Sequence, residues 1–569
     1  MCGIAGVIGE GSARPMIETI THRGPDGVRV EDGDGYSLAH ARLSIIDLEC
    51  GWQPLHAAGS TVIGNGEIYN YVELIEEFGL KEQLATGSDF EPMLHLYAQM
   101  GPAVFERLRG MYAFCLIGRD GRAWLVRDPF GIKPLYYARH PEGLALASEP
   151  RAFGRLGLKA AQADELLALN YALESPFQGV TRVEPGAVLE IPSNTHPDDS
   201  RDPVVSSQHS AGKSWVPTVV GMSGEKELIA ELDRILEDSV RVHQRSDVPY
   251  GLFLSGGVDS ASIATLMARL NARPVTAFTC GFDVPSARDE RTQAERVAKA
   301  LNLDWRETHF DEEDFWRILP QVAWALDDPT TDYATLPTYK LAEAAKGTLT
   351  VVLTGEGGDE LFGGYGRYRR ALRPGWLGGR AAEPQIDAPF LKDGGHEALE
   401  HWRDMAPTGG TRLQQAQAVD IATWLPNDLL LKLDRCLMAH GLEGRTPFLD
   451  KEVAAFAGAL SDRMKVRGRY GKWLLRKWLE RVCPEADPWG KKKGFTVPVA
   501  AWIAPRAADL GPKIAALKAV REVCDVDAVR AVFTDEAQAK NRWPLLFFAV
   551  WSLIHLDGAA PEEALKSIL

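Results

Sequence analysis

The spacing of apolar residues changes about a third of the way along the chain, and this change constrains the fold more than any other feature. Before it, short apolar runs stand between Gly, Asp and Pro residues, for example at 61–63, 112–117 and 123–126. Short runs divided by turn residues are typical of layered antiparallel sheets. A helical spacing interrupts them at 89–99, where apolar residues recur at steps of three and four.

The later part of the chain alternates between helix and strand patterns. Helices are predicted at 225–243 and 261–270, and buried strands at 250–254, 275–280 and 349–353. Such alternation favours an α/β doubly wound domain around a parallel sheet. Beyond about residue 397 the pattern is mostly helical.

A stretch rich in Ser, Thr, Asp, His and Pro at 192–217 separates the two patterns and is typical of a linker or exposed loop. A chain of 569 residues is also too long for a single hydrophobic core. We therefore expect one domain at 2–192, a linker or exposed loop at 193–222 and a second domain at 223–569.

Composition narrows the classes of function. The net charge of −15 argues against binding to nucleic-acid phosphates. The amino terminus has no basic leader, and the most apolar later stretch, 543–556, is shorter than the roughly 20 residues that span a bilayer, so it is predicted to be a core helix. The seven cysteines are scattered and none forms a C-x-x-C pair, which predicts neither disulfides nor a zinc site. A cytoplasmic protein without nucleic-acid or membrane partners is expected.

Cys2 is a candidate nucleophile. It becomes the first residue if the initiator methionine is removed, which is expected before a small side chain. An α-amine has a pKa of about 7.7–8.0, so near pH 7 part of it is neutral and can accept the thiol proton directly or through water. A cysteine in this place is otherwise typical of a small buried residue at the end of a strand.

Five further motifs follow Cys2 in order. They are His22–Asp26 (HRGPD), Arg42–Asp47 (RLSIID), Asn65–Asn70 (NGEIYN), Thr86–Asp89 (TGSD) and Arg127–Tyr136 (RDPFGIKPLY). As a set they closely resemble the class II glutamine amidotransferases, over roughly residues 2–190. The resemblance implies an α+β amino-terminal-nucleophile fold, a four-layer αββα sandwich.

The resemblance also implies a role for each residue of this first site. Cys2 attacks the glutamine amide, and the Asn65 side chain with the Gly66 N–H stabilises the oxyanion, because such donors suit charge that develops on a carbonyl oxygen. Arg42 pairs with the α-carboxylate, where a guanidinium fits two oxygens. The expected glutamine site is made of Arg42, Ile45, Ile46, Asn65, Gly66, Glu67 and Asp89, with Glu67 and Asp89 holding the ammonium and amide. Arg23 and Asp128 are expected to brace turns.

A second candidate site starts at Leu252–Ser260 (LFLSGGVDS), an apolar strand that runs into a Gly-rich turn and a helix. Small residues there let backbone N–H groups approach phosphate oxygens, and the start of the helix adds positive partial charge. The G-K-[ST] ending of a Walker A loop is absent. The string resembles the pyrophosphate loop of the ATP pyrophosphatase (adenine nucleotide α-hydrolase-like) superfamily.

Another Gly-rich string, Leu353–Tyr365 (LTGEGGDELFGGY), again follows an apolar strand. Asp259 and Asp359 then supply two carboxylates for Mg²⁺, which needs few protein ligands beside phosphate oxygens. The matches continue at Lys432–Arg435, Glu443–Asp450 and Lys491–Phe495. This order is similar to the synthetase domain of the asparagine synthetase B family, over roughly residues 223–510.

The resemblance implies that a carboxylate attacks the α-phosphorus of ATP and that ammonia then attacks the acyl-adenylate. Glu356 would accept the proton from the attacking nitrogen, and Lys492 with Mg²⁺ would offset the phosphate charge. The expected ATP and pyrophosphate site is made of Leu254, Ser255, Gly256, Gly257, Asp259, Ser260, Cys280, Thr354, Gly355 and Lys472. The expected substrates are glutamine, aspartate and ATP, and a homodimer is the expected assembly.

The acceptor acid is open at this point. The intact Cys2 favours amide formation over the ring-forming relatives, which need no ammonia, and Glu356 stands where the β-lactam synthetases carry a Tyr. Tyr333 stands near the place where an Arg is expected, and Gly444 replaces an apolar residue. A paralogue that amidates a peptide or sugar acid therefore remains an alternative, as does a non-catalytic metabolite-binding protein on the same fold.

Overall fold

The structure, a computed structural model, describes residues 2–140, 143–191, 224–282, 290–377, 379, 383–405, 410–490 and 497–569. The predicted linker at 193–222 and the lysine motif at 491–495, with Lys492, lie outside these ranges.

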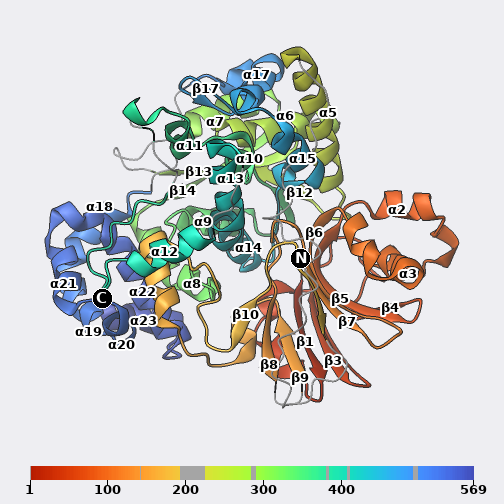
Figure 1. Cartoon of the computed structure of the whole chain (residues 1–569), viewed down its shortest axis with the longest axis horizontal. Coiled ribbons are helices and arrows are strands. Elements are labelled where there is room, and N and C mark those ends of the chain that lie inside the picture. Colours follow the sequence, from red (N-terminus) through yellow and green to blue (C-terminus); the bar gives the residue numbers. More distant parts are fainter. Residues whose placement is uncertain are drawn as a thin grey trace.

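Two antiparallel sheets form the first part of the chain (Figure 1). One has the strand order β10 (Val180–Arg182), β8 (Tyr136–His140), β9 (Gly143–Ala147), β1 (Gly3–Gly9), β3 (Tyr36–Arg42) and β2 (Gly27–Gly33). The other has the order β11 (Val188–Ile191), β7 (Ala123–Arg127), β6 (Gly110–Ile117), β5 (Ser60–Ile68) and β4 (Leu55–Ala57).

These sheets stack face to face with helices outside them. Leu38 of β3 and Ile63 of β5 meet in the core between the sheets, whereas the next residue of β3, Ala39, packs outward against Ile17 of α1 (Arg14–Glu18). On the far side, α2 (Tyr71–Phe78) and α3 (Glu91–Met100) cover the second sheet, with Met93 in that core. Alternate side chains of a strand thus pack into two different cores, one between the sheets and one under the helices. The αββα sandwich predicted from the sequence is confirmed.

A parallel sheet organises the second part, in the order β14 (Asp304–Phe310), β13 (Thr276–Phe282), β12 (Tyr250–Phe253), β15 (Val351–Leu353) and β16 (Glu443–Arg445). The chain moves outward from β12 in one direction and from β15 in the other. The strand order therefore reverses between β12 and β15, and ligands of such sheets bind beyond the carboxyl ends of the strands at this place.

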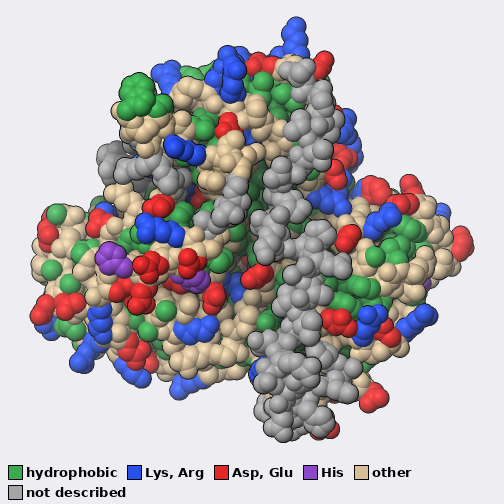
Figure 2. Space-filling view, viewed as in Figure 1, with side chains coloured by type: hydrophobic (Ala, Val, Ile, Leu, Met, Phe, Trp, Pro, Cys, Tyr) green, Lys and Arg blue, Asp and Glu red, His purple; other side chains and the backbone are tan. Residues whose placement is uncertain are grey.

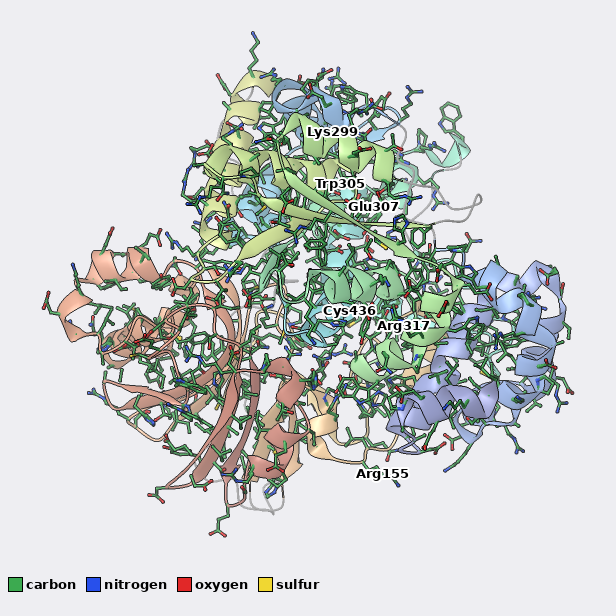
Figure 3. All side chains as sticks on the ribbon, turned by 180° about the vertical axis from the view of Figure 1, so that it is seen from behind. Arg155, Lys299, Trp305, Glu307, Arg317 and Cys436 are labelled. Atoms are coloured by element: carbon green, nitrogen blue, oxygen red, sulfur yellow. The ribbon has the colours of Figure 1, made fainter. Side chains whose placement is uncertain are left out.

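Helices cover both faces of the parallel sheet. α5 (Glu225–His243), α6 (Val258–Leu270) and α7 (Arg291–Ala300) share one core with Leu252 and Val351. α8 (Glu312–Ala325) and α9 (Thr335–Ala345) share the other with Phe278 and Val352. Seen from behind, Lys299 of α7 and Arg317 of α8 lie on either side of the strand that carries Trp305 and Glu307 (Figure 3). The predicted doubly wound domain is confirmed.

The remaining described elements are mostly helical, as predicted. They include α4 (Ala160–Leu169), α10 (Gly358–Phe362), α11 (Gly366–Ala371), α12 (His396–Asp404), α13 (Arg412–Ala422), α14 (Leu430–Met438), α15 (Lys451–Ala459), α16 (Asp462–Lys465), β17 (Val466–Arg467), β18 (Tyr470–Gly471), α17 (Trp473–Val482), α18 (Val499–Ile503), α19 (Ala507–Ala516), α20 (Lys518–Val523), α21 (Val526–Thr534), α22 (Arg542–His555) and α23 (Pro561–Ile568). The predicted core helix is α22, which buries Trp543, Phe547 and Trp551.

Within the described ranges, no helix is both long and apolar enough to cross a membrane. On the face drawn in Figure 2, acidic and basic side chains are interspersed over both the sandwich and the helical part. The described residues of this face therefore form no broad basic surface of the kind that binds nucleic-acid phosphates.

Candidate active site

Cys2 directly precedes β1 and lies beside Asn65 of β5. The Cys2 backbone nitrogen donates to Asn65 Oδ1 at 3.2 Å, and the Cys2 thiol lies 3.8 Å from the carbonyl oxygen of Leu43. Asn65 is completely buried, and its Nδ2 has no hydrogen-bond partner among the described residues. A buried donor without a partner, next to a nucleophile, suits an oxygen that gains charge during a reaction.

Gly66 follows Asn65 in a backbone conformation that requires glycine. Its φ is +132°, and a Cβ atom would lie 2.0 Å from the carbonyl oxygen of Met111. Glycine therefore allows β5 to approach β6 here while presenting the Gly66 N–H beside Asn65 along the same strand.

Glu67 and Asp89 are two buried carboxylates of the same site. Asp89 accepts a 2.6 Å hydrogen bond from the N–H of Ile68, yet burial raises the pKa of Asp89 to about 7. Burial, followed by the charges of Asp89 and Glu443, raises the pKa of Glu67 well above its usual range. Such a pair is stabilised by a nearby cation. One is supplied by Arg445, whose Nη2 lies 3.6 Å from Glu67 Oε1.

Arg42 lies in the wall of this site and is engaged by the loop that follows it. Its guanidinium donates to the carbonyl oxygens of Leu48, at 3.1 Å, and Asp47, at 2.5 Å. Burial lowers its pKa, and the Cys2 thiol opposes this shift. The same loop carries Ile45, which is buried and accepts a 2.9 Å bond from the Asp247 N–H, and the half-buried Ile46. The structure thus brings Arg42, Ile45 and Ile46 to one loop beside Cys2.

The first Gly-rich turn joins β12 to the start of α6. Leu254 directly follows the strand and is buried, and Gly256 has a φ of +73°. The Ser260 hydroxyl accepts from the Ser255 N–H at 3.2 Å and lies 3.0 Å from the Ser255 hydroxyl. These bonds close the turn around Gly257, which caps the first turn of α6.

The second Gly-rich turn, after β15, packs directly against the first. A Cβ atom on Gly355 would lie 2.8 Å from Asp259 Cβ, and one on Gly358 would lie 2.5 Å from Asp259 Oδ1. Thr354 is held by β16 instead, because its N–H donates to the carbonyl oxygen of Arg445 at 2.8 Å. The glycines are therefore what lets the two turns share one crevice.

Lys472 joins the two candidate Mg²⁺ ligands. Its ammonium lies 2.6 Å from Asp359 Oδ1 and also contacts Asp259 Oδ2. Burial opposes the charge of Lys472, but the two aspartates outweigh it and raise its pKa. Both carboxylates thus converge on one cation, and they are the oxygen ligands that Mg²⁺ prefers. In the described part of the chain, no group of three or more His, Cys, Asp or Glu side chains is arranged to hold a metal ion.

Glu356 belongs to a charged cluster beside these turns. Burial raises its pKa, and Lys432 opposes that shift. Lys432 in turn forms a 3.0 Å ion pair with Asp332, next to the partly exposed Tyr333. Cys280, expected near the nucleotide, is buried on β13, and burial raises its pKa to about 12. It faces the core shared with α8 and α9.

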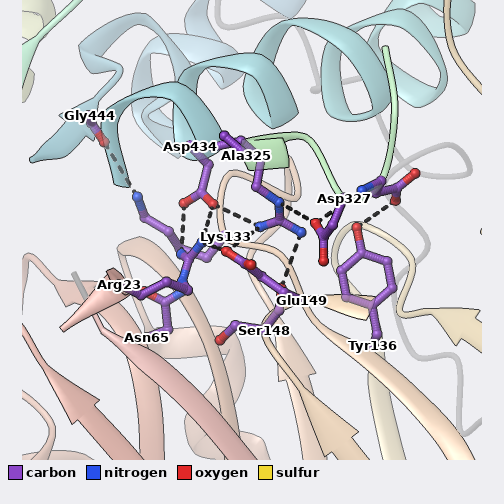
Figure 4. Close-up of polar contacts among 12 residues, drawn as sticks. Arg23, Asn65, Lys133, Tyr136, Ser148, Glu149, Ala325, Asp327, Asp434 and Gly444 are labelled. Atoms are coloured by element: carbon purple, nitrogen blue, oxygen red, sulfur yellow. Dashed lines mark hydrogen bonds and ion pairs between the residues drawn. The ribbon is translucent and has the colours of Figure 1, made fainter. Parts of the chain in front are cut away.

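A layer of buried charges holds the sandwich against the parallel-sheet part (Figure 4). This junction layer consists of Arg23, Lys133, Glu149, Asp327, Asp434 and Arg435. Arg23 donates to Glu149 and to Asp434, each at 2.8 Å, and its Nε donates to the Cys2 carbonyl oxygen at 3.2 Å. Arg435 lies 3.0 Å from Asp327.

The structure separates the roles of the two residues that were expected to brace turns. Asp128 does so, since it accepts backbone bonds from Phe130, Ile132 and Lys133. Arg23 instead reaches across to Asp434 of α14. Sequence reasoning missed this contact because no local pattern indicates a partner 411 residues away.

Comparisons with known proteins cover both parts of the chain. The family model described as asparagine synthase matches residues 231–553, and that described as glutamine amidotransferase domain matches residues 1–200. The chain is 32% identical to "Asparagine synthetase [glutamine-hydrolyzing] 1" of Bacillus subtilis, over 99% of this chain and 98% of that protein.

Two further relatives carry different names, one that of an asparagine synthetase and one that of an amidase. "Asparagine synthetase B [glutamine-hydrolyzing]" of Escherichia coli is 29% identical, over 87% of this chain and 82% of its own length. "Amidase chry2" of Gibberella zeae is 31% identical, over 65% of this chain and 60% of its own length. The two family models together thus match most of the chain, and the Bacillus subtilis relative matches it over nearly its whole length.

Proposed function

The chain belongs to the asparagine synthase family, and on that premise we propose that it uses ATP and glutamine to convert L-aspartate into asparagine, releasing glutamate, AMP and pyrophosphate. One observation carries the proposal: Arg445 contacts Glu67 of the candidate glutamine site with its side chain and Thr354 of the candidate ATP site with its backbone. The two candidate sites thus share a wall. We also propose that 2–192 is the glutaminase domain and 223–569 the synthetase domain.

Glutamine hydrolysis would begin at Cys2. With the initiator methionine removed, the Cys2 nitrogen becomes an α-amine that can accept the thiol proton. The Sγ then attacks the side-chain amide of glutamine, and the buried Asn65 Nδ2 with the Gly66 N–H stabilises the oxyanion. Collapse of the tetrahedral intermediate releases ammonia, and water hydrolyses the thioester to give glutamate.

Binding of glutamine would use the charges of the site. Glu67 and Asp89 receive the α-ammonium, which supplies the positive charge that two buried carboxylates need. Arg42 exchanges the carbonyl oxygens of Asp47 and Leu48 for the α-carboxylate. Ile45 and Ile46 shape the loop between them.

Activation of aspartate would take place where the two Gly-rich turns meet. The β-carboxylate attacks the α-phosphorus of ATP, pyrophosphate leaves, and β-aspartyl-AMP remains. Ser255–Gly257, Ser260, Thr354 and Gly355 hold phosphate oxygens, with Leu254 and Cys280 beside the nucleotide. Asp259 and Asp359 would hold Mg²⁺, which when bound offsets phosphate charge, and Lys472 and Lys492 would add positive charge.

Amide formation would follow at the same place. Ammonia attacks the acyl carbon of β-aspartyl-AMP, Glu356 accepts a proton from the nitrogen, and AMP leaves. The raised pKa of Glu356 suits a group that must gain a proton. Free ammonia is mostly ammonium at pH 7, so passage from Cys2 to Glu356 through the shared wall, away from water, is part of the proposal.

Another acceptor acid is the second candidate, and Tyr333 is the observation that favours it. Its side chain is 37% exposed beside Asp332, where an Arg was expected. Gly444 carries less weight, because a Cβ there would lie 2.9 Å from Leu433 Cγ, so packing explains the glycine. Product analysis with ATP, glutamine and a panel of acids tests the proposal. Formation of asparagine supports it, and efficient amidation of another acid without asparagine refutes it.

A further inference from the structure

Arg445 belongs to two environments at once. Its side chain is completely buried, with Nε 2.5 Å from Glu443 Oε1 and Nη2 3.6 Å from Glu67 Oε1. Its backbone carbonyl accepts the Thr354 N–H at 2.8 Å and the Thr354 hydroxyl at 3.4 Å. Glu67 lies on β5 of the sandwich, and Thr354 opens the second Gly-rich turn.

The parallel-sheet side holds Arg445 more firmly than the sandwich side does. β16 pairs with β15, with Arg445 opposite Leu353. Nη1 also donates to the backbone carbonyls of His243, at 2.8 Å, and Arg245, at 2.7 Å. The contact with Glu67 is longer than all of these and lies beyond hydrogen-bond distance. Of these contacts, the one between Arg445 and Glu67 is therefore the one that a ligand can change at the smallest cost in free energy.

A glutamine molecule would change this contact directly. In the ligand-free protein Arg445 is a cation that faces Glu67, which has the carboxylate of Asp89 as its neighbour. Glu67 Oε2 has no hydrogen-bond partner among the described residues. An α-ammonium placed between Glu67 and Asp89 would supply the charge that Arg445 now supplies, so the two cations compete for one carboxylate.

We propose that Arg445 is a positioning residue that couples the two sites, because glutamine bound at Glu67 displaces Nη2 of its guanidinium and so alters how its carbonyl holds Thr354 in the ATP turn. The inference rests on the proposed function, since it takes glutamine as the ligand of one site and ATP as the ligand of the other. Coupling of this kind is reciprocal: whatever ATP does to the affinity for glutamine, glutamine does to the affinity for ATP.

Binding measurements on a protein that cannot hydrolyse glutamine test the proposal. In the Cys2→Ala variant, glutamine is titrated calorimetrically with and without Mg²⁺ and an ATP analogue with a methylene bridge between the α- and β-phosphates. We expect the two dissociation constants to differ by about fivefold or more, the lower end of usual allosteric coupling. Adding Arg445→Lys keeps the positive charge but removes the planar set of guanidinium N–H donors, and it should bring the ratio of the two dissociation constants to one.

Arg109→Lys is the matched control. Arg109 also forms an ion pair at this boundary, with Nε 2.8 Å from Asp450 Oδ2, but it contacts neither Glu67 nor Thr354 within the described residues. It should leave the ratio unchanged. The coupling would be overturned if the ratio of dissociation constants were one in the Cys2→Ala variant, or if Arg445→Lys left that ratio unchanged.

A measurement without any change at Arg445 covers the case in which Arg445→Lys does not fold. A crystal structure of the Cys2→Ala variant with bound glutamine should show the ammonium between Glu67 and Asp89, and Arg445 Nη2 farther than 3.6 Å from Glu67. An unchanged distance refutes the proposal. If the proposed function fails, the Cys2→Ala variant binds no glutamine at all. If only the coupling fails, this variant binds glutamine and the ATP analogue independently of each other.

Discussion

The ammonium of Lys472 lies 2.6 Å from the carboxylate of Asp359. Because the same ammonium contacts Asp259, a single cation holds together carboxylates that stand 100 residues apart and come from different Gly-rich turns. Only 4% of the Lys472 side chain is exposed. The pair of turns is therefore held together by charge as well as by glycine packing.

Replacing Lys472 by Met should destabilise the protein, by less than the roughly 3–5 kcal/mol that breaking a fully buried ion pair costs, because two half-buried carboxylates then lose their counter-charge. Chemical denaturation with and without Mg²⁺ measures this. Added Mg²⁺ should stabilise the variant more than the wild type, since it can supply the missing charge. Lys477→Met is the control and should change little, because Lys477 is a more exposed lysine on α17, the helix that directly follows Lys472. Equal effects of the two variants would contradict the bridging role.

Replacing Cys2 by Ala should abolish synthesis from glutamine and preserve synthesis from ammonium salts. The nucleophile would be lost, while the two Gly-rich turns lie in the other part of the fold. Amide formation measured with each nitrogen source, beside a thermal-unfolding curve for the variant, checks this. Equal loss of both activities in a folded variant would mean that the two reactions do not occupy separate sites.

Asp259→Asn or Asp359→Asn should impair synthesis from either nitrogen source and leave glutamate release from glutamine largely intact. Removing a Mg²⁺ ligand beside polyphosphate should cost several kcal/mol of transition-state stabilisation. Exchange of labelled pyrophosphate into ATP, with the acceptor acid present, reports the first half-reaction. Exchange at the wild-type rate in either variant argues against these carboxylates as ligands.

Glutamine binding should strengthen as the pH rises toward 7. Burial raises the pKa of Asp89 to about 7 in the ligand-free protein, so below that pH Asp89 holds a proton that the incoming ammonium must displace. The dissociation constant should increase at least about tenfold for each pH unit below 7, because Glu67, whose pKa is also raised, adds to the effect of Asp89. Calorimetry on Cys2→Ala in buffers of different ionisation enthalpy would count the protons released, and Asp89→Asn should bind weakly and with a smaller pH dependence.

The stability of the ligand-free protein should instead fall as the pH rises toward 7. A carboxyl group whose folded pKa lies above its ordinary 3.8 destabilises the fold once it must ionise, so the contribution of Asp89 falls as the pH rises from about 4 to 7. Glutamine should therefore stabilise the Cys2→Ala variant most near pH 7. A thermal shift by glutamine that does not depend on pH would show that Asp89 is not its partner.

Much of this arrangement follows from local sequence patterns. The helix at 225–243 matches α5, and the apolar runs at 250–254 and 349–353 match β12 and β15, because periodicity reports which side chains face a core. The sequence predicted that Asp259 and Asp359 supply carboxylates to one Mg²⁺. The structure brings both to Lys472 because the carboxyl ends of neighbouring parallel strands lie at one edge of a sheet.

The contacts between distant segments could not be predicted in this way. Arg445 meets Glu67, and Lys472 meets two aspartates, only after the chain has folded. A buried arginine and a surface arginine look alike in a sequence, since the partners of each come from distant segments. The roles of the individual site residues stay predictions until they are changed one at a time.

The junction layer decides how freely the two parts of this protein can be recombined. Arg23, Glu149, Asp434 and Arg435 are all buried, and each acid on one side is matched to a base on the other. A sandwich taken from a relative would have to bring the same pattern of charges or leave some of them desolvated without a partner. Chimaeras should therefore be cut so that both sides of the layer come from one parent.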